Sequence, residues 1–326
     1  MKAIVQHTYG TADVLELRDI DQPSIKDDEV LVEVRAAGVD PGVLVLMTGR
    51  PFLVRLVGYG LRRPKVAARG RDLAGVVAAV GARVTRFRPG DEVFGTAESG
   101  SFAEYARARE GRLAAKPANL SFLEAAAVPV SGVTALQAVR DVAQVRAGQR
   151  VMVIGAAGGV GSYAVQLARS LGAHVTGVCG PGKAELVRSL GAEDVIDYTA
   201  AEVDGHGSRY DVIIDTAGNR PLSVLRRALA PRGTLALVGG GHVSSKVLGG
   251  MDRTLRAGLV SMVGGQRLRG VMGRERAAEL DELRELIEAG SVTPAIDRTY
   301  ALPAAPDAIR YLAEGHPAGK VVVTIG

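Results

Sequence analysis

An apolar run that ends in a cluster of glycines, at residues 150–172 (RVMVIGAAGGVGSYAVQLARSLG), constrains the fold more than any other stretch. Residues 151–154 show no polar alternation, which is typical of a parallel strand covered on both faces. Four glycines follow directly: Gly155, Gly158, Gly159 and Gly161. They let the backbone turn tightly, so that a diphosphate can approach the N–H groups that begin the next helix. With the apolar run at residues 174–178, the stretch predicts a βαβ unit with a dinucleotide site, although such a turn can also be purely structural.

One position departs from the dinucleotide-binding pattern G-x-G-x-x-G. Ala156 takes the place of the first glycine, whereas Gly158 and Gly161 occupy the other two. Alanine is small enough for the turn if its φ angle is negative. The match is therefore weakened but kept, and we expect the following helix to present its positive end to an anion.

The composition limits the class of protein. A chain of 326 residues with 47% hydrophobic content exceeds what one core usually holds, so two domains are expected. The net charge of +5 and the pI of about 9.4 would suit nucleic acid, but only 4% of residues are aromatic and the basic residues are scattered. We therefore expect no nucleic-acid partner.

The single cysteine, Cys179, excludes internal disulfide bonds and a cysteine-based structural zinc site. The N-terminal residues lack the apolar segment of a secretory signal. The longest uncharged stretch, residues 151–168, contains glycines and polar side chains that suit a membrane span poorly. These features indicate a cytoplasmic protein with no membrane partner.

Residues 1–120 consist mostly of short β-rich runs separated by Gly, Pro and Asp turns, a spacing that predicts a small barrel. Residues 49–70 interrupt these runs with apolar side chains among arginines and prolines. They are either a lid over a binding site or an extra helix packed on the barrel. Ser121 and Glu124 form a capping box, which predicts a helix that starts at Phe122.

Strands and helices alternate from residue 150 onward, which indicates an α/β fold with a doubly wound parallel sheet. Near the end of this region we expect a helix at residues 251–257 and the last strand at residues 259–263. A strand at residues 320–325 has no partner nearby and must join the N-terminal barrel. The predicted domains are a discontinuous β domain at residues 1–120 and 268–326 and an inserted nucleotide-binding domain at residues 121–267.

The residues after the second strand of the βαβ unit favour NADP over NAD. In an NAD site an acidic residue about 20 residues past the glycines binds the ribose 2′-OH. That position is Cys179, Gly180 follows it, and Lys183 stands where it could contact a 2′-phosphate. A solvated lysine in the first turn of a helix would look the same in the sequence. We predict NADP(H) as the cofactor.

Several segments keep the order and spacing of a known family: PVSGVTALQAV, AAGGVGSYAVQLARSLGAHV, LVRSLGAEDVIDY, RFRPGDEVFG and the terminal GKVVVTIG. Over nearly its whole length the chain resembles the medium-chain dehydrogenase/reductase superfamily. Within it, the chain is most similar to the zinc-independent, quinone-oxidoreductase-like branch. The resemblance implies a GroES-like β-barrel domain, a Rossmann domain, a cleft between them and a homodimer formed through the strand expected at residues 259–263.

The resemblance also implies which residues bind the cofactor. Thr134 would border the nicotinamide amide, although it could be an ordinary residue at the start of a helix. The residues expected around the diphosphate are Ala157, Gly158, Gly159, Val160 and Gly161. Those expected at the 2′-phosphate are Gly180, Lys183 and Tyr198, the last of which could also be a simple strand-end aromatic. Those expected elsewhere along the cofactor and the cleft are Thr216, Ala217, Val238, Gly239, Gly240 and Lys320.

The departures from the family's zinc-dependent members predict a site without metal. Those members have a cysteine ligand near residue 39 and a Gly-His-Glu motif where this chain has Gly70, Arg71 and Asp72. Val39 and Asp40 stand in the first place, and a guanidinium cannot bind a metal.

Without a Lewis acid, the alkoxide charge that hydride transfer builds on an ordinary ketone lacks a partner, whereas quinones and enones disperse it themselves. No tyrosine is followed by a lysine four positions later, so the usual proton-donating pair is missing too. We therefore predict NADPH-dependent reduction of a small, apolar, conjugated acceptor bound beneath residues 52–61. Asp40 and Tyr59 are the candidate catalytic groups, each of which could instead have an ordinary loop role. Two alternatives stay open, an alcohol or carbonyl reductase of the same family and a low-turnover protein that senses NADPH.

Overall fold

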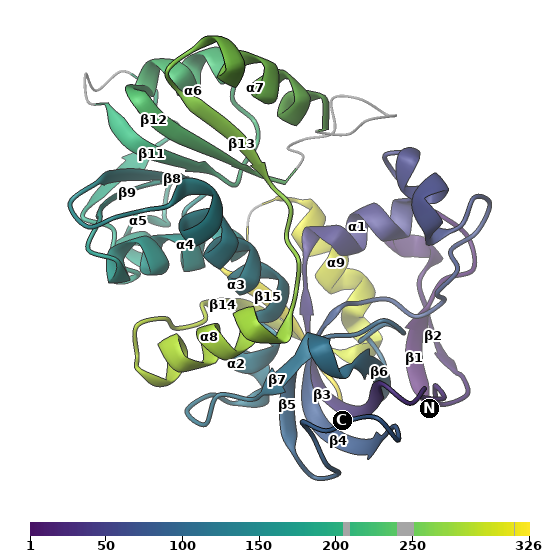
Figure 1. Ribbon diagram of the computed structural model, residues 1–326. Helices are drawn as coiled ribbons and strands as arrows, with labels where there is room; N and C mark the ends of the chain where they lie inside the picture. Colours follow the sequence, from purple (N-terminus) through teal and green to yellow (C-terminus); the bar gives the residue numbers. More distant parts are fainter. Residues whose placement is uncertain (205–208, 240–250, 316) are drawn as a thin grey trace. The chain divides into compact units, whose positions relative to one another are not determined.

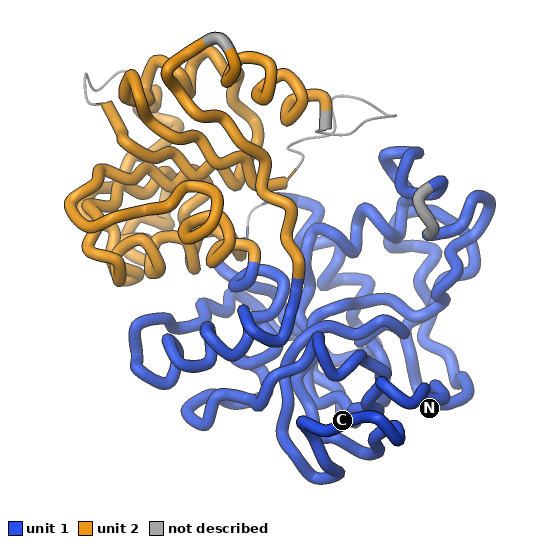
Figure 2. The backbone as a smooth tube through the Cα atoms, viewed as in Figure 1, with its two compact units in different colours: residues 1–133, 275–326 blue, residues 134–274 orange. Residues whose placement is uncertain are grey.

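The computed structural model describes residues 1–204, 209–239, 251–315 and 317–326. Contacts divide the chain into two compact units, a first unit of residues 1–133 and 275–326 and a second unit of residues 134–274 (Figure 2). These divisions differ from the predicted boundaries at residues 120 and 268. The difference at the first boundary arises because helix α2 (Phe122–Ala126) packs on the strands of the first unit.

Strands of the second unit form one parallel sheet (Figure 1). In the described residues they are β8 (Arg150–Ile154), β9 (His174–Cys179), β10 (Asp194–Asp197), β11 (Tyr210–Asp215), β12 (Leu229–Val238) and β13 (Arg267–Val271). Their spatial order is β10-β9-β8-β11-β12-β13, so the direction of winding reverses beside β8. This is the doubly wound arrangement that the sequence predicts, and residues 151–154 are at most 1% exposed, as expected for its central strand.

Helices cover both faces of this sheet (Figure 1). On one face lie α4 (Gly159–Ser170) and α5 (Ala184–Ser189), and on the other lie α6 (Leu222–Ala228) and α7 (Met251–Val263). The core beneath α6 and α7 is continuous from Met152 through Ile213 and Leu235 to Leu268. Apolar side chains on both sides of the central strands therefore hold the layers together.

The prediction of a strand at residues 259–263 is wrong. These residues form the last part of α7, and the last strand is β13. The run LVSMV is apolar enough for a strand, and a short apolar run cannot be distinguished from part of a helix by composition. Leu255, Leu259 and Met262 are 63%, 67% and 82% exposed, and their helical spacing places them together along α7.

The first unit is built on the long strand β3 (Glu29–Val39). Strand β4 (Asp72–Val80) pairs along one side of β3, while β6 (Tyr105–Arg109) and β15 (Lys320–Thr324) share the other side. The prediction that the C-terminal strand joins the N-terminal sheet is thus confirmed. Strand β14 (Ile296–Ala301), which the sequence analysis missed, pairs in parallel with β15.

Shorter elements complete the first unit. The remaining described strands are β1 (Lys2–Val5), β2 (Glu16–Asp19), β5 (Glu92–Thr96) and β7 (Leu113–Ala115). The helices are α1 (Pro41–Thr48), α2, α8 (Ala277–Glu288) and α9 (Ala305–Ala313), while α3 (Pro129–Leu136) continues into the π-helical η4 (Gln137–Ala143) of the second unit. The capping box is confirmed: Ser121 Oγ accepts a hydrogen bond from the Glu124 N–H, and Glu124 Oε2 accepts one from the Ser121 N–H.

Residues 49–70 contain one short helical segment, the π-helical turn η2 (Arg55–Tyr59). The Arg55 guanidinium lies 4.1 Å from the centre of the Tyr9 ring, and Tyr9 Oη donates a hydrogen bond of 2.5 Å to the Gly60 carbonyl. Phe52 and Tyr59 are half exposed. Among the helices that the structure describes, none has the length and apolar character needed to cross a membrane.

Candidate functional site

The turn between β8 and α4 is built for a close approach to its backbone. Gly155 has a φ angle of +78°, in the left-handed region, whereas Ala156 keeps an ordinary φ and is buried. A Cβ atom on Gly161 would lie 2.0 Å from the Gly155 carbonyl oxygen, so only glycine allows the helix to start this close to the turn. Gly158 caps α4 without a side-chain hydrogen bond, which leaves the first N–H groups of the helix open. The tight-turn glycine is therefore Gly155, one residue before the position that the pattern assigned to it.

The carboxyl ends of β11 and β12 lie at the same edge of the sheet as this turn. Thr216 follows β11, and its Oγ1 donates a hydrogen bond of 2.8 Å to the Ile154 carbonyl, which fastens the two strand ends together. Ala217 comes next. Val238 ends β12, and Gly239 directly after it has a φ of +74°. Gly240 lies outside the described residues. In doubly wound sheets ligands bind at this edge, so the structure brings the predicted backbone groups together.

A buried ion pair that the sequence analysis missed supports this edge. Asp215 is fully buried at the end of β11 and accepts hydrogen bonds from the N–H groups of Ala217 and Gly218. Its other oxygen lies 2.6 Å from Nη2 of Arg253 on α7. An acidic residue that ends an apolar strand (VIID) was the available signal, but its partner could not be found without the fold.

The three residues expected at the 2′-phosphate also meet at one place. A Cβ atom on Gly180 would lie 3.0 Å from Tyr198 Oη, so the Tyr198 side chain rests against the loop that follows β9. Lys183 caps α5 at the end of that loop. Burial raises the pKa of the Cys179 thiol and the Asp197 carboxylate adds to this, whereas Lys183 and Arg188 partly offset it. Two cations thus lie near the end of β9, where an NAD site has an acidic residue.

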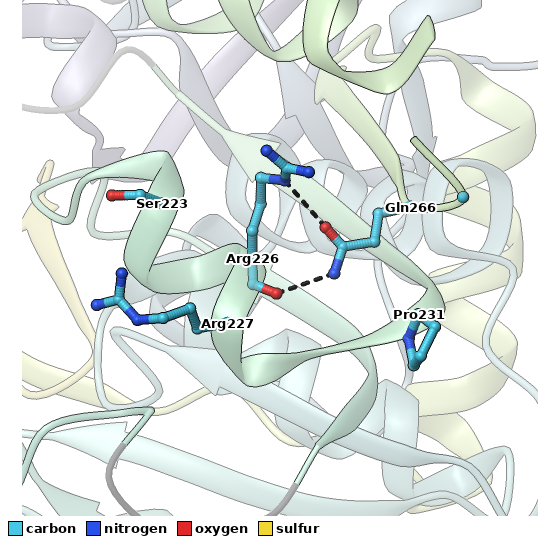
Figure 3. A pocket seen from close by; sticks show the side chains of 6 residues that line it. Ser223, Arg226, Arg227, Pro231 and Gln266 are labelled. Carbon is cyan, nitrogen blue, oxygen red and sulfur yellow. Dashed lines mark hydrogen bonds between the residues drawn. The ribbon is translucent and has the colours of Figure 1, made fainter. Parts of the chain in front are cut away.

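A surface pocket of the second unit lies at the opposite edge of the sheet (Figure 3). It is lined by residues at the amino ends of β12 and β13 and the end of α6: Ser223, Arg226, Arg227, Pro231, Gly265 and Gln266. Nε of Arg226 donates to Gln266 Oε1 at 3.0 Å, and Nε of Arg227 to Asp204 Oδ2 at 2.7 Å. These arginines hold the local structure together and are not part of the cofactor edge.

In the first unit, Asp40 is the N-cap of α1. Its Oδ1 accepts a hydrogen bond of 2.7 Å from the Gly42 N–H, and Pro41 occupies the first helical position. Asp40 is 2% exposed, and its Oδ2 has no hydrogen-bond partner among the residues that the structure describes. The Asp-Pro pair before an apolar run is a helix-start signal that the sequence analysis did not use.

Lys320 lies in a buried polar cluster. Its Nζ donates hydrogen bonds of 3.1 Å to both Asp72 Oδ2 and Ser131 Oγ, and Asp72 Oδ1 accepts one from the Val130 N–H. Asp72 is fully buried and Lys320 is 2% exposed. Burial raises the pKa of Asp72 to about 6 although Lys320 opposes this, and the Asp40 carboxylate adds to the increase. Lys320 is thus bonded to protein groups in this structure.

Arg71, directly before β4, is paired with Glu275. Its Nη2 is 3.0 Å from Oε2 of Glu275, and the two side chains are 29% and 9% exposed. Burial by itself lowers the pKa of Arg71, but the carboxylates of Glu275, Asp40 and Asp72, together with Tyr59, raise it above its ordinary value. The two candidate catalytic residues, Asp40 and Tyr59, are therefore both close to Arg71. From the sequence, Arg71 is recognisable only as a residue that cannot bind a metal, because nothing in the sequence connects it with Glu275.

Thr134, which was predicted to border the nicotinamide, and the predicted absence of a metal site remain to be described. Thr134 is partly exposed and lies in α3. Among the described residues no three His, Cys, Asp or Glu side chains are grouped so that they could hold a metal ion.

Comparisons with known proteins agree with the two-part architecture. Residues 26–118 match the family model of the alcohol dehydrogenase GroES-like domain, and residues 190–323 match that of zinc-binding dehydrogenases. The first unit thus contains the GroES-like domain that the resemblance implied.

Relatives match over the whole chain. The mitochondrial NAD(P)H oxidoreductase RTN4IP1 of Mus musculus is 32% identical over 100% of this chain and 89% of its own length. The chloroplastic NADPH-dependent alkenal/one oxidoreductase of Arabidopsis thaliana is 33% identical over 99% of this chain and 79% of its own length. The structure of the quinone oxidoreductase from Coxiella burnetii superposes with a TM-score of 0.85 at 28% identity, and the match covers 100% of this chain and 99% of the other. The chain therefore belongs to the medium-chain dehydrogenase/reductase superfamily, in its quinone-oxidoreductase-like branch, whose members are oxidoreductases that use a nicotinamide cofactor.

Proposed function

We propose that this chain is an NADPH-dependent reductase that transfers hydride to a conjugated acceptor, a quinone or an enone such as a 2-alkenal, without zinc. The observation that carries the proposal is the chemistry of the charged cluster formed by Asp40, Arg71 and Glu275. Its central group is the Arg71 guanidinium, which donates hydrogen bonds but cannot bind a metal. Such a site suits an acceptor that disperses most of the incoming negative charge itself. The names of the alkenal/one and quinone oxidoreductase relatives support the same substrate class.

The turn between β8 and α4 fits the diphosphate of a nicotinamide dinucleotide. A Cβ atom on Gly161 would collide with the Gly155 carbonyl, and the uncapped N-terminus of α4 offers backbone donors and the positive end of a helix dipole. When bound, the nicotinamide supplies the hydride. The residues proposed to hold the diphosphate are Ala157, Gly158, Gly159, Val160 and Gly161, and those proposed along the rest of the cofactor are Thr134, Thr216, Ala217, Val238, Gly239, Gly240 and Lys320.

The end of β9 supports NADP as the form that is bound. The position of the acidic residue is occupied by the buried Cys179, with Lys183 close to it and Tyr198 against Gly180. The nearby Asp197 turns its Oδ1 to the N–H and hydroxyl of Thr199. A 2′-phosphate would meet a lysine and a tyrosine hydroxyl there, and hydrogen bonds between charged groups are the stronger kind.

Dissociation constants for NADPH and NADH test the cofactor assignment. We expect the parent protein to bind NADPH about ten- to hundredfold more tightly, because a hydrogen bond to a charged group contributes about 1.5–3 kcal/mol. Lys183→Ala should lose most of this preference by weakening NADPH binding alone, while Lys183→Arg should keep it. Equal binding of both dinucleotides by the parent would refute the assignment.

NADPH oxidation with a 1,4-quinone, an enone and a simple aldehyde tests the reaction. The proposal predicts turnover with the quinone and the enone and little with the aldehyde. Turnover with the aldehyde alone would instead support the alcohol or carbonyl reductase, a function that the family model's alcohol dehydrogenase name favours. Tight NADPH binding without turnover of any acceptor would support the sensor.

A homodimer formed through α7 and β13 is part of the proposal. Strand β13 lies at the edge of the described sheet, Met272 directly after it is 81% exposed, and Leu255, Leu259 and Met262 of α7 are 63–82% exposed. Contiguous exposed apolar side chains of this kind often mark a protein interface. Light scattering should give twice the chain mass for the parent and the single mass for Leu259→Asp. A cytoplasmic location is proposed with it, because the single buried thiol of Cys179 suits a reducing compartment.

A further inference from the structure

Two polar groups of opposite charge lie close together in the first unit without forming an ion pair. A Cβ atom on Gly42 would lie 2.6 Å from Asp40 Oδ1 and 3.9 Å from Arg71 Nη1, so the absence of a side chain there keeps the space beside both groups open. Asp40 Oδ2 is buried and, within the described part of the chain, accepts no hydrogen bond. A buried oxygen of this kind usually accepts a hydrogen bond, and the hydroxyl of a bound molecule would supply one here.

The Arg71 guanidinium has N–H groups that are available to donate hydrogen bonds to a ligand. Its planar head carries five N–H groups, and in the part of the chain that the structure describes its recorded ion pair is the one from Nη2 to Glu275. The side chain is 29% exposed, so part of it is open to a bound molecule. Glu275 is nearly buried and fixes the orientation of the head. The cation is therefore held in place with unused donors beside Asp40.

The surroundings suit an apolar molecule with one polar end. Tyr59 is near enough to interact electrostatically with Arg71, and it ends η2. Phe52 and Leu61, on either side of η2, are 46% and 54% exposed. An apolar acceptor could cover these side chains while its oxygen meets the guanidinium.

We infer that Arg71 is a catalytic residue, which donates a hydrogen bond from Nη1 to the carbonyl oxygen of the conjugated acceptor while negative charge develops there. The inference rests on the function proposed above and deepens it. In an enone, hydride adds to the β-carbon, the C=C pair shifts, and the charge arrives on the carbonyl oxygen as an enolate. A proton from water then bonds to the α-carbon, so NADPH is oxidised and the alkene reduced. In a quinone, the same contact holds the hydroquinone oxyanion. A proton from water then bonds to that oxygen, and the new hydroxyl donates a hydrogen bond to Asp40 Oδ2.

Binding of a charged probe tests the contact without turnover. 4-Nitrophenolate mimics the oxyanion, and 4-nitroanisole has the same ring without the charge. We expect calorimetry on the protein saturated with NADP⁺ to show that Arg71→Gln weakens binding of the phenolate at least about tenfold, the loss of one charge-assisted hydrogen bond, and leaves the anisole unchanged. Equal phenolate affinity of parent and variant, or no phenolate binding by the parent, would overturn the inference.

Kinetics with an enone provide the second measurement. Removal of one donor to a developing oxyanion costs about 10²–10³ in kcat, so Arg71→Gln should lose about that factor and Arg71→Lys less. The matched control is Arg107→Gln, because Arg107 is also 29% exposed and pairs with the buried Glu29 at 3.1 Å in the same unit. It should retain parental kcat. An equal loss in both variants would show that Arg71 has only a structural role.

Two further controls distinguish a failure of Arg71→Gln to fold, and a failure of the proposed function, from a failure of the inference about Arg71. Arg71→Gln leaves the Glu275 carboxylate without its cation, so the double variant with Glu275→Gln replaces it if the single variant fails to fold, and Arg107→Gln with Glu29→Gln is then its control. If the parent reduces neither enone nor quinone, the proposed function is wrong. The phenolate comparison still decides whether Arg71 binds an oxyanion.

Discussion

The cofactor edge of the second unit and the charged cluster of the first unit are built in different ways. At the cofactor edge, backbone N–H groups are the proposed binding groups, and Gly155, Gly158 and Gly161 lie within seven consecutive residues. In the charged cluster, side chains are the proposed binding groups. They come from separate segments of the sequence, at Asp40, Arg71 and Glu275. The first kind of site is visible as a local motif, whereas the second exists only when the fold assembles it. Substitutions in the two regions should therefore fail for different reasons.

The largest effect is expected from the buried ion pair of Lys320 and Asp72 in the first unit. Lys320→Met leaves the Asp72 carboxylate buried without its cation, which should lower the free energy of unfolding by about 3–5 kcal/mol. Adding Asp72→Asn should restore much of the loss, because the amide can still accept the Val130 hydrogen bond. Urea denaturation of the parent and both variants measures this. A single variant as stable as the parent would show that the pair contributes nothing.

The same carboxyl makes stability depend on pH. Because burial raises the pKa of Asp72 to about 6, from an ordinary value of 3.8, the folded state binds the proton more tightly than the unfolded state does. The stabilising contribution of this proton is complete below the unfolded pKa and is lost as pH rises through about 6. Relative to Asp72→Asn/Lys320→Met, the parent should lose stability over this interval. Parallel pH profiles of the two proteins would contradict the assignment.

At the cofactor edge the expected failure is steric. Gly161→Ala places a methyl group against the Gly155 carbonyl, so the start of α4 must move, at a cost of about 1–3 kcal/mol. NADPH affinity should fall by about ten- to hundredfold with it. Gly258→Ala on α7 is the control, because apart from its chain neighbours and the backbone of its own helix no described atom lies within 4 Å of its Cβ position. If both variants bind NADPH like the parent, the turn between β8 and α4 tolerates a side chain at residue 161 and the steric explanation is wrong.

The smallest effect is expected at Asp40, where substitution tests its role as the cap of α1. Asp40→Ala should cost about 1 kcal/mol through loss of the α1 cap, whereas Asp40→Asn keeps a capping oxygen and should cost less. Thermal melting of both variants measures the difference. If Asn is as destabilising as Ala, the hydrogen bond to the Gly42 N–H does not stabilise the helix.

The parts of the fold that follow local rules could be predicted. The central strand, the capping box at Ser121 and the doubly wound alternation are all present. The strand at the C-terminus was assigned correctly to the N-terminal sheet because it had no nearby partner. The alignment with the glycine pattern placed Ala156 at the tight turn, whereas the residue with the positive φ angle is Gly155, one position earlier.

Errors arose where tertiary context decides. Residues 259–263 fit a strand locally, but the helical spacing of Leu255, Leu259 and Met262 belongs to a longer helix. The polar strand β14 carries little apolar alternation, so only its pairing with β15 identifies it. The contact between Arg71 and Glu275 joins residues that no sequence pattern relates. Of the candidate site, the glycine turn was therefore predictable and the charge cluster was not.

If Arg71 is the group that stabilises the charge on the acceptor oxygen, the protein should reduce only acceptors that disperse most of that charge themselves. The most direct measurement compares kcat/KM of the parent for an enone and for the saturated ketone with the same carbon skeleton, at saturating NADPH. We expect the enone to be preferred by at least about a hundredfold, since the ketone would build a full alkoxide that one hydrogen-bond donor cannot stabilise. Equal or faster reduction of the saturated ketone would contradict it.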